Sequence, residues 1–206
     1  MDTLTRVIGD DRGVAVVCME MQRGVVGDLA DHPAADAVRS TDLVERLASV
    51  LAAARDRGSP VVHCTASFRR DRAGSFRNMP AIERLLDNPE HLVVGSPATE
   101  VIPELLAPTD IESPRHHGIS PFTGTSLDTL LRSLGVQTVI AAGVSLNRGI
   151  VGLTIEAVNR GYDVAIPRDC VAGYPASYGE LVLANTLDAI STLTTSDELL
   201  RVWASV

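Results

Sequence analysis

Residues 139–150 read VIAAGVSLNRGI, and this stretch decides the fold. Its apolar beginning predicts a buried strand, and the glycine that follows predicts a tight turn. Asn147 then stands where a helix would begin, so we expect it to be the N-cap of that helix. A strand that passes through a turn into a helix is the repeating unit of α/β folds. In hydrolytic enzymes of this class, such a turn is the usual place of the nucleophile.

The rest of the chain repeats this alternation of short apolar runs and amphipathic stretches. The pattern predicts a single domain over residues 1–206, an α/β fold with a doubly wound, mainly parallel sheet and helices on both faces in three layers. Thr195 and Glu198 predict a capping box for the last helix. We expect strands near residues 15–19, 60–64, 111–114, 138–142, 163–166 and 192–194, and helices near residues 42–57, 79–86, 127–134, 148–159, 177–189 and 196–204.

The composition limits the partners that fit this chain. Of its 206 residues, 45% are hydrophobic, and the formal net charge is -8. Nucleic acid and anionic membranes both need a basic surface, so we expect neither as a partner and expect a small-molecule substrate. No apolar run approaches the length of a membrane span, and no signal peptide is visible. The three cysteines lack metal-site spacing, which is typical of a reducing cytoplasm, and we expect Cys18 and Cys64 to be buried strand residues.

Residues 66–99 interrupt the alternation. They carry several arginines with scattered glycines and prolines, which predicts an irregular excursion with one short helix. Such a segment is either a solvated loop or a lid or subunit contact, and the sequence leaves both alternatives open.

Candidate site residues follow three of the expected strands. Ligands of open α/β sheets bind outside the carboxyl ends of the strands, so Glu20, residues 115–117 and residues 145–149 are expected to converge on one crevice. An acid at the end of an apolar strand is costly to bury unless it is used, paired with an arginine or capping a helix. Neighbouring side chains of an extended segment point to opposite faces, so at most one of His116 and His117 should face the crevice.

Four blocks of the sequence resemble the isochorismatase-like hydrolases, and they occur in the family's order. They are VAVVCMEMQ at residues 14–22, RHHGISPFTGTSL at residues 115–127, the stretch at residues 139–150, and EAVNRGYDV at residues 156–164. The resemblance reaches from residue 14 to about residue 173. It implies the family's α/β/α fold, hydrolysis of a small molecule, and a homodimer or a larger homo-oligomer.

The resemblance also assigns residues. The family's usual catalytic residues are an Asp, a Lys and a Cys, and the matching positions here hold Glu20, His116 and Gly149. Glu20 keeps a carboxyl one methylene further out, His116 replaces a permanent cation with a group that titrates near neutral pH, and Gly149 has no thiol. No metal site is expected, because the Asp, His and His ligands of nicotinamide-cleaving relatives have no counterpart, and we expect His63 to be only a packing residue of its strand. The candidate substrate-binding residues are Gln22, Arg115, His117, Phe122, Ser145, Asn147 and Arg148.

Two hypotheses follow. In the first, the chain hydrolyses an enol ether or a similar non-amide bond, with Glu20 as acid or base and His116 or Arg115 stabilising charge. The subgroup of the family that has Gly at the cysteine position cleaves vinyl ethers in this way, and the reaction needs no cofactor. In the second, the chain is a catalytically silent member that binds a small ligand or a protein partner. All three usual catalytic positions have changed, which favours the second, while the retained acid at Glu20 favours the first.

Overall fold

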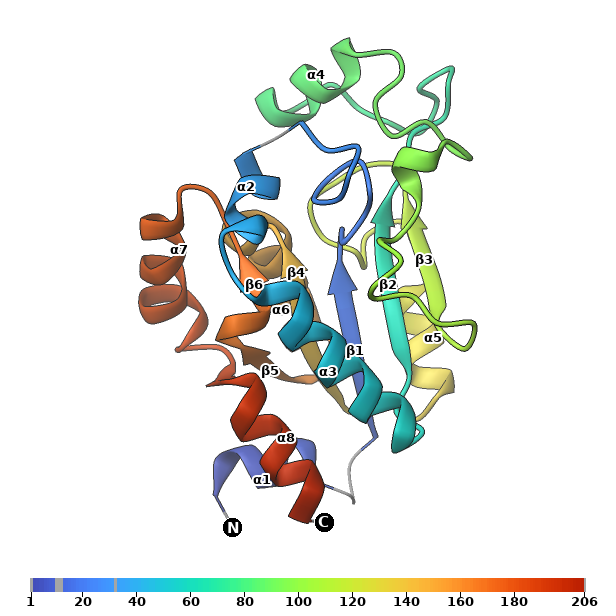
Figure 1. Cartoon of the computed structure of the whole chain (residues 1–206). Helices are drawn as coiled ribbons and strands as arrows, with labels where there is room; N and C mark the ends of the chain where they lie inside the picture. Colours follow the sequence, from blue (N-terminus) through green and yellow to red (C-terminus); the bar gives the residue numbers. More distant parts are fainter. Residues whose placement is uncertain (1, 10–12, 32, 206) are drawn as a thin grey trace.

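The computed structural model describes residues 2–9, 13–31 and 33–205. Its centre is a seven-stranded sheet with the order β3-β2-β1-β4-β5-β7, in which β6 pairs with β4 and all pairs are parallel (Figure 1). The predicted α/β class with a mainly parallel sheet is therefore confirmed. The strands are β1 (Val14–Met19), β2 (Val61–Ala66), β3 (Ile111–Arg115), β4 (Thr138–Val144), β5 (Asp163–Pro167), β6 (Val171–Ala172) and β7 (Thr192–Thr194).

The central strands are apolar on both sides because both faces of the sheet are covered by helices. Every residue of β1, β2 and β4 is buried. The helices are α1 (Thr3–Ile8), α2 (Pro33–Arg39), α3 (Leu43–Asp56), α4 (Pro80–Asp87), α5 (Leu127–Ser133), α6 (Val151–Asn159), α7 (Ala176–Val182) and α8 (Ser196–Ser205). None of the helices in the described ranges combines the length and the apolar character that a bilayer crossing requires.

Each face of the sheet has its own hydrophobic core. On one face, side chains of α1, α3 and α8 pack against alternate residues of β1, such as Val16 and Cys18. On the other face, side chains of α5, α6 and α7 pack against the intervening residues, such as Val17 and Met19. Figure 1 shows α3 in front of the sheet and α8 beside α1 at its lower end, with α4 set apart at the end toward which the strands of the sheet point.

The predicted strands are each found within one or two residues, whereas some short elements were not predicted. α1, α2 and the two-residue β6 had no counterpart among the expected elements. Two predicted helices begin or end in π-helical turns, at Leu146–Ile150 before α6 and at Leu183–Leu187 after α7. The expectation that Asn147 caps α6 is wrong, because the helical turn already begins at Leu146 and the Asn147 amide instead donates to the carbonyl oxygen of Tyr174 at 3.2 Å.

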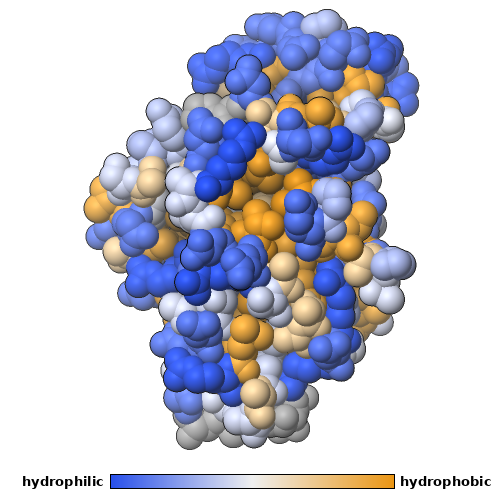
Figure 2. Space-filling model, viewed as in Figure 1, coloured by the Kyte–Doolittle hydropathy of each residue, from blue (hydrophilic) through white to orange (hydrophobic). Residues whose placement is uncertain are grey.

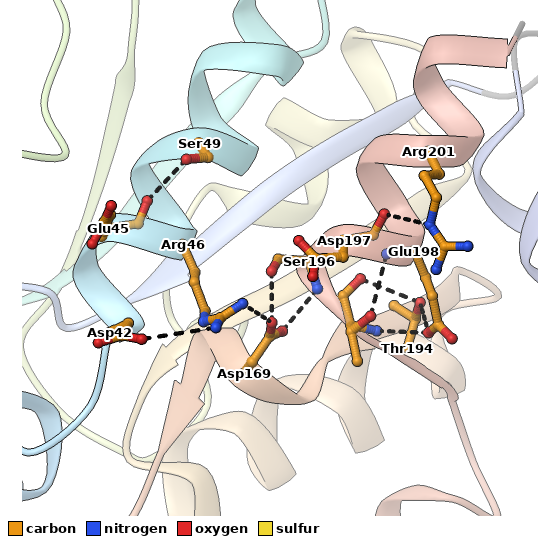
Figure 3. A network of polar contacts seen from close by, with 11 residues as sticks. Asp42, Glu45, Arg46, Ser49, Asp169, Thr194, Ser196, Asp197, Glu198 and Arg201 are labelled. Carbon is orange, nitrogen blue, oxygen red and sulfur yellow. Dashed lines mark hydrogen bonds and ion pairs between the residues drawn. The ribbon is translucent and has the colours of Figure 1, made fainter.

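A polar network fixes the start of α8 (Figure 3). The predicted capping box is confirmed, since the Thr195 amide donates to the Glu198 carboxylate at 3.0 Å and the Glu198 amide donates to the Thr195 hydroxyl at 3.2 Å. The carboxylate of Asp169 accepts from the amide of Ser196 at 2.8 Å and from its hydroxyl at 2.6 Å. Arg46 of α3 also contacts Asp169, at 3.4 Å, so these contacts join α8 to α3.

His63 lies in β2, on the face of the sheet that α1, α3 and α8 cover, and away from the carboxyl ends of the strands. Its Nε2 is 3.0 Å from the carboxylate of Asp110, which also forms an ion pair with Arg55 at 2.7 Å. Burial lowers the pKa of His63, against the opposing effect of the Asp110 hydrogen bond. The neutral imidazole is therefore favoured, and His63 acts in packing and hydrogen bonding within the sheet layer.

Candidate active site

The candidate site lies where the direction of the strand order reverses. The chain proceeds from β1 to β2 and β3 on one side and returns to β4 on the other, so the reversal falls between β1 and β4. Open α/β sheets bind ligands in the crevice at this point. A cavity of about 430 Å³ lies here, and its lining includes Glu20 after β1, Ala66 at the end of β2, Arg115 at the end of β3, and Val144 at the end of β4. The expected convergence of strand ends is therefore present.

Glu20 and Arg115 form an ion pair in the cavity. Arg115 Nη2 donates to Glu20 Oε1, and Arg115 Nε donates to the carbonyl oxygen of Gly118 at 3.2 Å. The pair is largely shielded from water, because the side chains are 20% exposed for Glu20 and 8% for Arg115. Glu20 adopts a φ of 50°, so the chain turns sharply as it leaves β1. The guanidinium beside it holds the carboxylate in place at the cavity.

The cation that contacts Glu20 is an arginine, and the chain has no lysine that could take this place. All 18 residues counted as Lys or Arg are arginines. An arginine keeps its charge throughout the physiological pH range and cannot exchange a proton with a substrate. Arg115 can therefore hold and orient Glu20 or a ligand anion, and it cannot serve as an acid or a base.

The turn after β4 forms another wall of the cavity. Gly143 has a φ of 97°, and the peptide bond between Val144 and Ser145 is cis. Ser145, Arg148 and Gly149 line the cavity. A Cβ atom built on Gly149 would lie 3.2 Å from both Met19 Cε and the Val144 carbonyl oxygen, so the backbone is closely packed at this position.

The two histidines after β3 have different surroundings. His117 lines the cavity, and its Nδ1 accepts a hydrogen bond from the Phe76 amide at 3.2 Å. His116 is exposed, and its Nδ1 lies 2.6 Å from the Ser67 carbonyl oxygen. His116 is not among the residues that line the cavity. The positive charge beside Glu20 is thus supplied by Arg115, the residue before His116. Arg115 and His116 were the two candidates that the sequence left open for this role.

Three other candidate residues have structural contacts instead of a place in the cavity lining. The buried amide of Gln22 donates to the carbonyl oxygens of Ala66 and Thr99, and its oxygen accepts from the Ala66 amide at 2.8 Å. Phe122 is buried in the core on the face covered by α5, α6 and α7, and it stacks on Tyr162, with 6.0 Å between ring centroids. Asn147 holds the Tyr174 carbonyl, as described above. Through its two contacts with Ala66, Gln22 joins the segment after β1 to the end of β2.

The excursion at residues 66–99 forms the outer wall of the cavity. It contributes Phe68 together with Met79, Ile82 and Leu85 at α4, and its packed side chains form a small core of their own. Figure 2 shows that the outer surface of the α4 region is mostly hydrophilic, whereas hydrophobic surface lies below it toward the rest of the molecule. Sequence reasoning missed these wall residues, although Ile82, Leu85 and Leu86 are spaced as one apolar helix face. That spacing predicts burial without identifying the surface that it covers.

The cysteines are expected to be unreactive, because all three are buried and none lines the cavity. Burial raises the pKa of Cys64 to about 12 and also raises the pKa of Cys18 and of Cys170. The thiolate is the reactive form. Treatment of the native protein with iodoacetamide should therefore leave any hydrolytic activity intact, with the mass of the intact protein unchanged. Loss of activity with an adduct mapped to Cys64 would show that the nucleophile had been misplaced.

Comparison with known proteins supports the arrangement seen in the structure. Residues 14–198 match the family model described as the Isochorismatase domain. The chain is 28% identical to maleamate amidohydrolase of Pseudomonas putida over 170 residues, which cover 80% of this chain and 74% of that protein. A solved isochorismatase family protein from Desulfovibrio vulgaris superposes with a TM-score of 0.82 at 26% identity, covering 94% of this chain and 99% of that one. The N-carbamoylsarcosine amidase of Thermoplasma acidophilum superposes with a TM-score of 0.70 at 25% identity, covering 89% and 96%. The chain, with its strand ends converging on one cavity, belongs to the isochorismatase family.

Proposed function

We propose that the chain hydrolyses a non-amide bond of a small organic molecule, with Glu20 as the proton-transferring group and without a covalent cysteine intermediate. One observation carries the proposal: the carboxylate of Glu20 lies in the cavity and is held there by Arg115. Gly149 occupies the position that we assign to the family's nucleophile, and it offers no side chain. A carboxylate can instead activate a water molecule.

The proposed step is general base catalysis. Glu20 accepts a proton from water as the water oxygen bonds to the carbon under attack, and the proton then passes to the leaving oxygen as its bond to that carbon breaks. Arg115 holds Glu20 in position for the first transfer. The exposed guanidinium of Arg148, beside Gly149 in the cavity wall, adds a positive charge to the site.

The ion pair bears on which bonds are cleaved. Enol ether cleavage starts with an acid that donates a proton, whereas attack by activated water on an ester or a similar bond starts with a carboxylate that accepts one. In the structure Glu20 Oε1 is an acceptor, from Arg115 Nη2. We therefore place ester-like bonds first within the proposal and enol ethers second. The proposed assembly is a homodimer or a larger homo-oligomer, which the exposed apolar side chains on the outer helices support, among them Ile155, Val158, Tyr178 and Leu181.

Primary amides are expected to remain intact, whereas aryl esters or vinyl ethers are expected to be hydrolysed. An amide nitrogen is a poor leaving group, and the covalent step that a thiol would provide is absent in this proposal. Incubation with nicotinamide and maleamate, followed by an ammonia assay, tests the first half, and a panel of p-nitrophenyl esters and vinyl ethers tests the second. Ammonia release by the unmodified chain would contradict the proposal.

The Gly149→Cys variant should not gain efficient amidase activity, because catalytic residues act as a unit and the other two positions also differ.

The alternative is a binding protein in which the Glu20–Arg115 pair only joins the ends of β1 and β3. The observation in its favour is that Arg115 already satisfies Glu20 without a substrate. The two functions differ in what the carboxylate does, so the Glu20 variants described in the Discussion separate them. A silent protein should show no turnover with any member of the panel and should still bind a ligand in the cavity.

A further inference from the structure

Unpaired arginines are concentrated at the cavity. Within the ranges that the structure describes, Arg6, Arg84 and Arg148 are the arginines whose guanidinium groups make no hydrogen bond, ion pair or ring contact with another described residue. Arg84 lies on α4, Arg148 lies in the turn after β4, and both line the cavity. Arg6 lies on α1 and is not part of the lining.

Arg115 adds an unused donor to the same cavity. Its Nε and Nη2 have acceptors, whereas Nη1 is buried and has no hydrogen-bond partner within the described ranges. A buried donor of a charged group that stays unsatisfied is costly, so a nearby ligand acceptor is favoured. Guanidinium groups bind carboxylates through paired, charge-assisted hydrogen bonds.

The charge of the cavity differs from that of the whole chain. Its lining holds three arginines and two carboxylates, those of Glu20 and Asp31, in a chain whose formal net charge is -8. Glu20 is neutralised by Arg115, which leaves Arg84 and Arg148 facing the single carboxylate of Asp31. Such local excess of positive charge attracts an anion even where the protein as a whole repels it.

The remaining wall is apolar. Met79, Ile82 and Leu85 at α4 lie on one side of the cavity, and Val25 and Leu29 line it from the segment after β1. Leu29 is 49% exposed, so about half of this large apolar side chain at the cavity is in contact with water. An apolar part of a ligand that packs against this wall would remove both surfaces from water.

We infer that the substrate of this site is an organic carboxylate with an apolar chain, whose anionic group is bound by Arg148 and Arg84 and whose chain packs beneath α4. The inference names a substrate class for the proposed hydrolytic site, and so it rests on that site being the functional one. The Nη1 of Arg115 provides a further donor deeper in the cavity.

Binding of simple probes tests the inference without requiring turnover. Isothermal titration calorimetry with hexanoate should show binding that weakens as ionic strength rises, because the Arg84 and Arg148 side chains are exposed to solvent. Hexanamide, which has the same shape without the charge, should bind about tenfold more weakly. Hexylammonium should not bind measurably. Butyrate should bind about sixteenfold more weakly than hexanoate, since the two differ by two methylenes and each buried methylene contributes about a fourfold change in affinity.

Two variants with matched controls locate the contacts. Arg148→Gln should weaken hexanoate binding about tenfold and leave hexanamide binding unchanged, whereas Arg6→Gln, at the unpaired arginine outside the cavity, should change neither. Leu85→Ser should weaken hexanoate more than acetate, whereas Leu106→Ser, at an exposed leucine outside the cavity lining, should affect neither probe.

The outcomes separate this inference from the proposed function. Equal affinity for hexanoate and hexanamide, equal effects of the Arg148 and Arg6 variants, or no binding of hexanoate would each overturn the inference. Hexanoate binding in a protein that cleaves none of the ester or vinyl ether panel would support the inference and contradict the proposed hydrolysis. Efficient cleavage of neutral esters without carboxylate binding would support the proposed function and overturn the inference alone.

Discussion

Replacement of Glu20 by Gln is expected to reduce turnover by roughly a hundredfold to ten-thousandfold, the usual contribution of a positioned acid or base. The variant keeps the size of the side chain and removes its ability to exchange a proton. The amide oxygen of the substituted side chain can still accept from Arg115, so the fold should persist. Initial rates with an ester or vinyl ether found in the panel give the effect, and circular dichroism with thermal melting checks the fold.

Two further variants show whether the effect is chemical. Glu20→Asp should retain part of the rate, because the carboxylate is kept and withdrawn by one methylene. Glu104→Gln, at an exposed carboxylate that is not part of the cavity lining, should leave turnover and stability close to those of the unmodified chain. Unchanged turnover in Glu20→Gln, or activity lost only through unfolding, would make the carboxylate structural and favour the binding-protein alternative.

Replacement of Gly143 by Ala is expected to lower the free energy of unfolding by about 4 kcal/mol or more, at the upper end of single substitutions. A Cβ atom at this position would lie 2.3 Å from the carbonyl oxygen of Met19 and 2.9 Å from its amide nitrogen, which is closer than real Cβ atoms approach. Met19 belongs to the neighbouring strand β1 and pairs with Gly143 in the sheet, so neither backbone can move aside without breaking the ladder. Chemical denaturation monitored by circular dichroism measures the loss.

Gly161→Ala provides the matched control for this prediction. Gly161 also has a positive φ, of 86°, but a Cβ atom there would meet nothing within 4 Å. Its substitution should therefore cost only the backbone strain of a left-handed conformation, on the order of 1 kcal/mol. Equal losses in the two variants would show that backbone strain accounts for the whole effect and that the contact with β1 contributes nothing.

The sequence determined the fold because its signals are local. Buried parallel strands require continuous apolar runs, and amphipathic helices require a repeat of three to four residues, so β1 and β4 were visible in the residues themselves. The capping box of α8 was predicted for the same reason, since it joins residues only three apart. The start of α6 was misjudged, because the π-helical turn at Leu146–Ile150 depends on how the chain leaves β4.

The sequence also determined that the strand ends would meet, because parallel strands place their carboxyl ends at one edge of a sheet. It could not decide between Arg115, His116 and His117, which are consecutive residues. The register of β3 against β2 and the contact with Gly118 decided that Arg115 reaches Glu20 while the ring of His116 contacts Ser67.

Only the tertiary structure decided what surrounds the pair. Gln22 is held by Ala66 and Thr99, the latter 77 residues away in the sequence, so its structural contacts had no local signal. The excursion at residues 66–99 has no strand or helix pattern that fixes its position, and its place over the cavity follows from packing of α4 against the rest of the chain. Contacts between residues distant in the sequence therefore decided which side chains line the site, because the free energy of such contacts depends on the assembled sheet and not on local residue patterns.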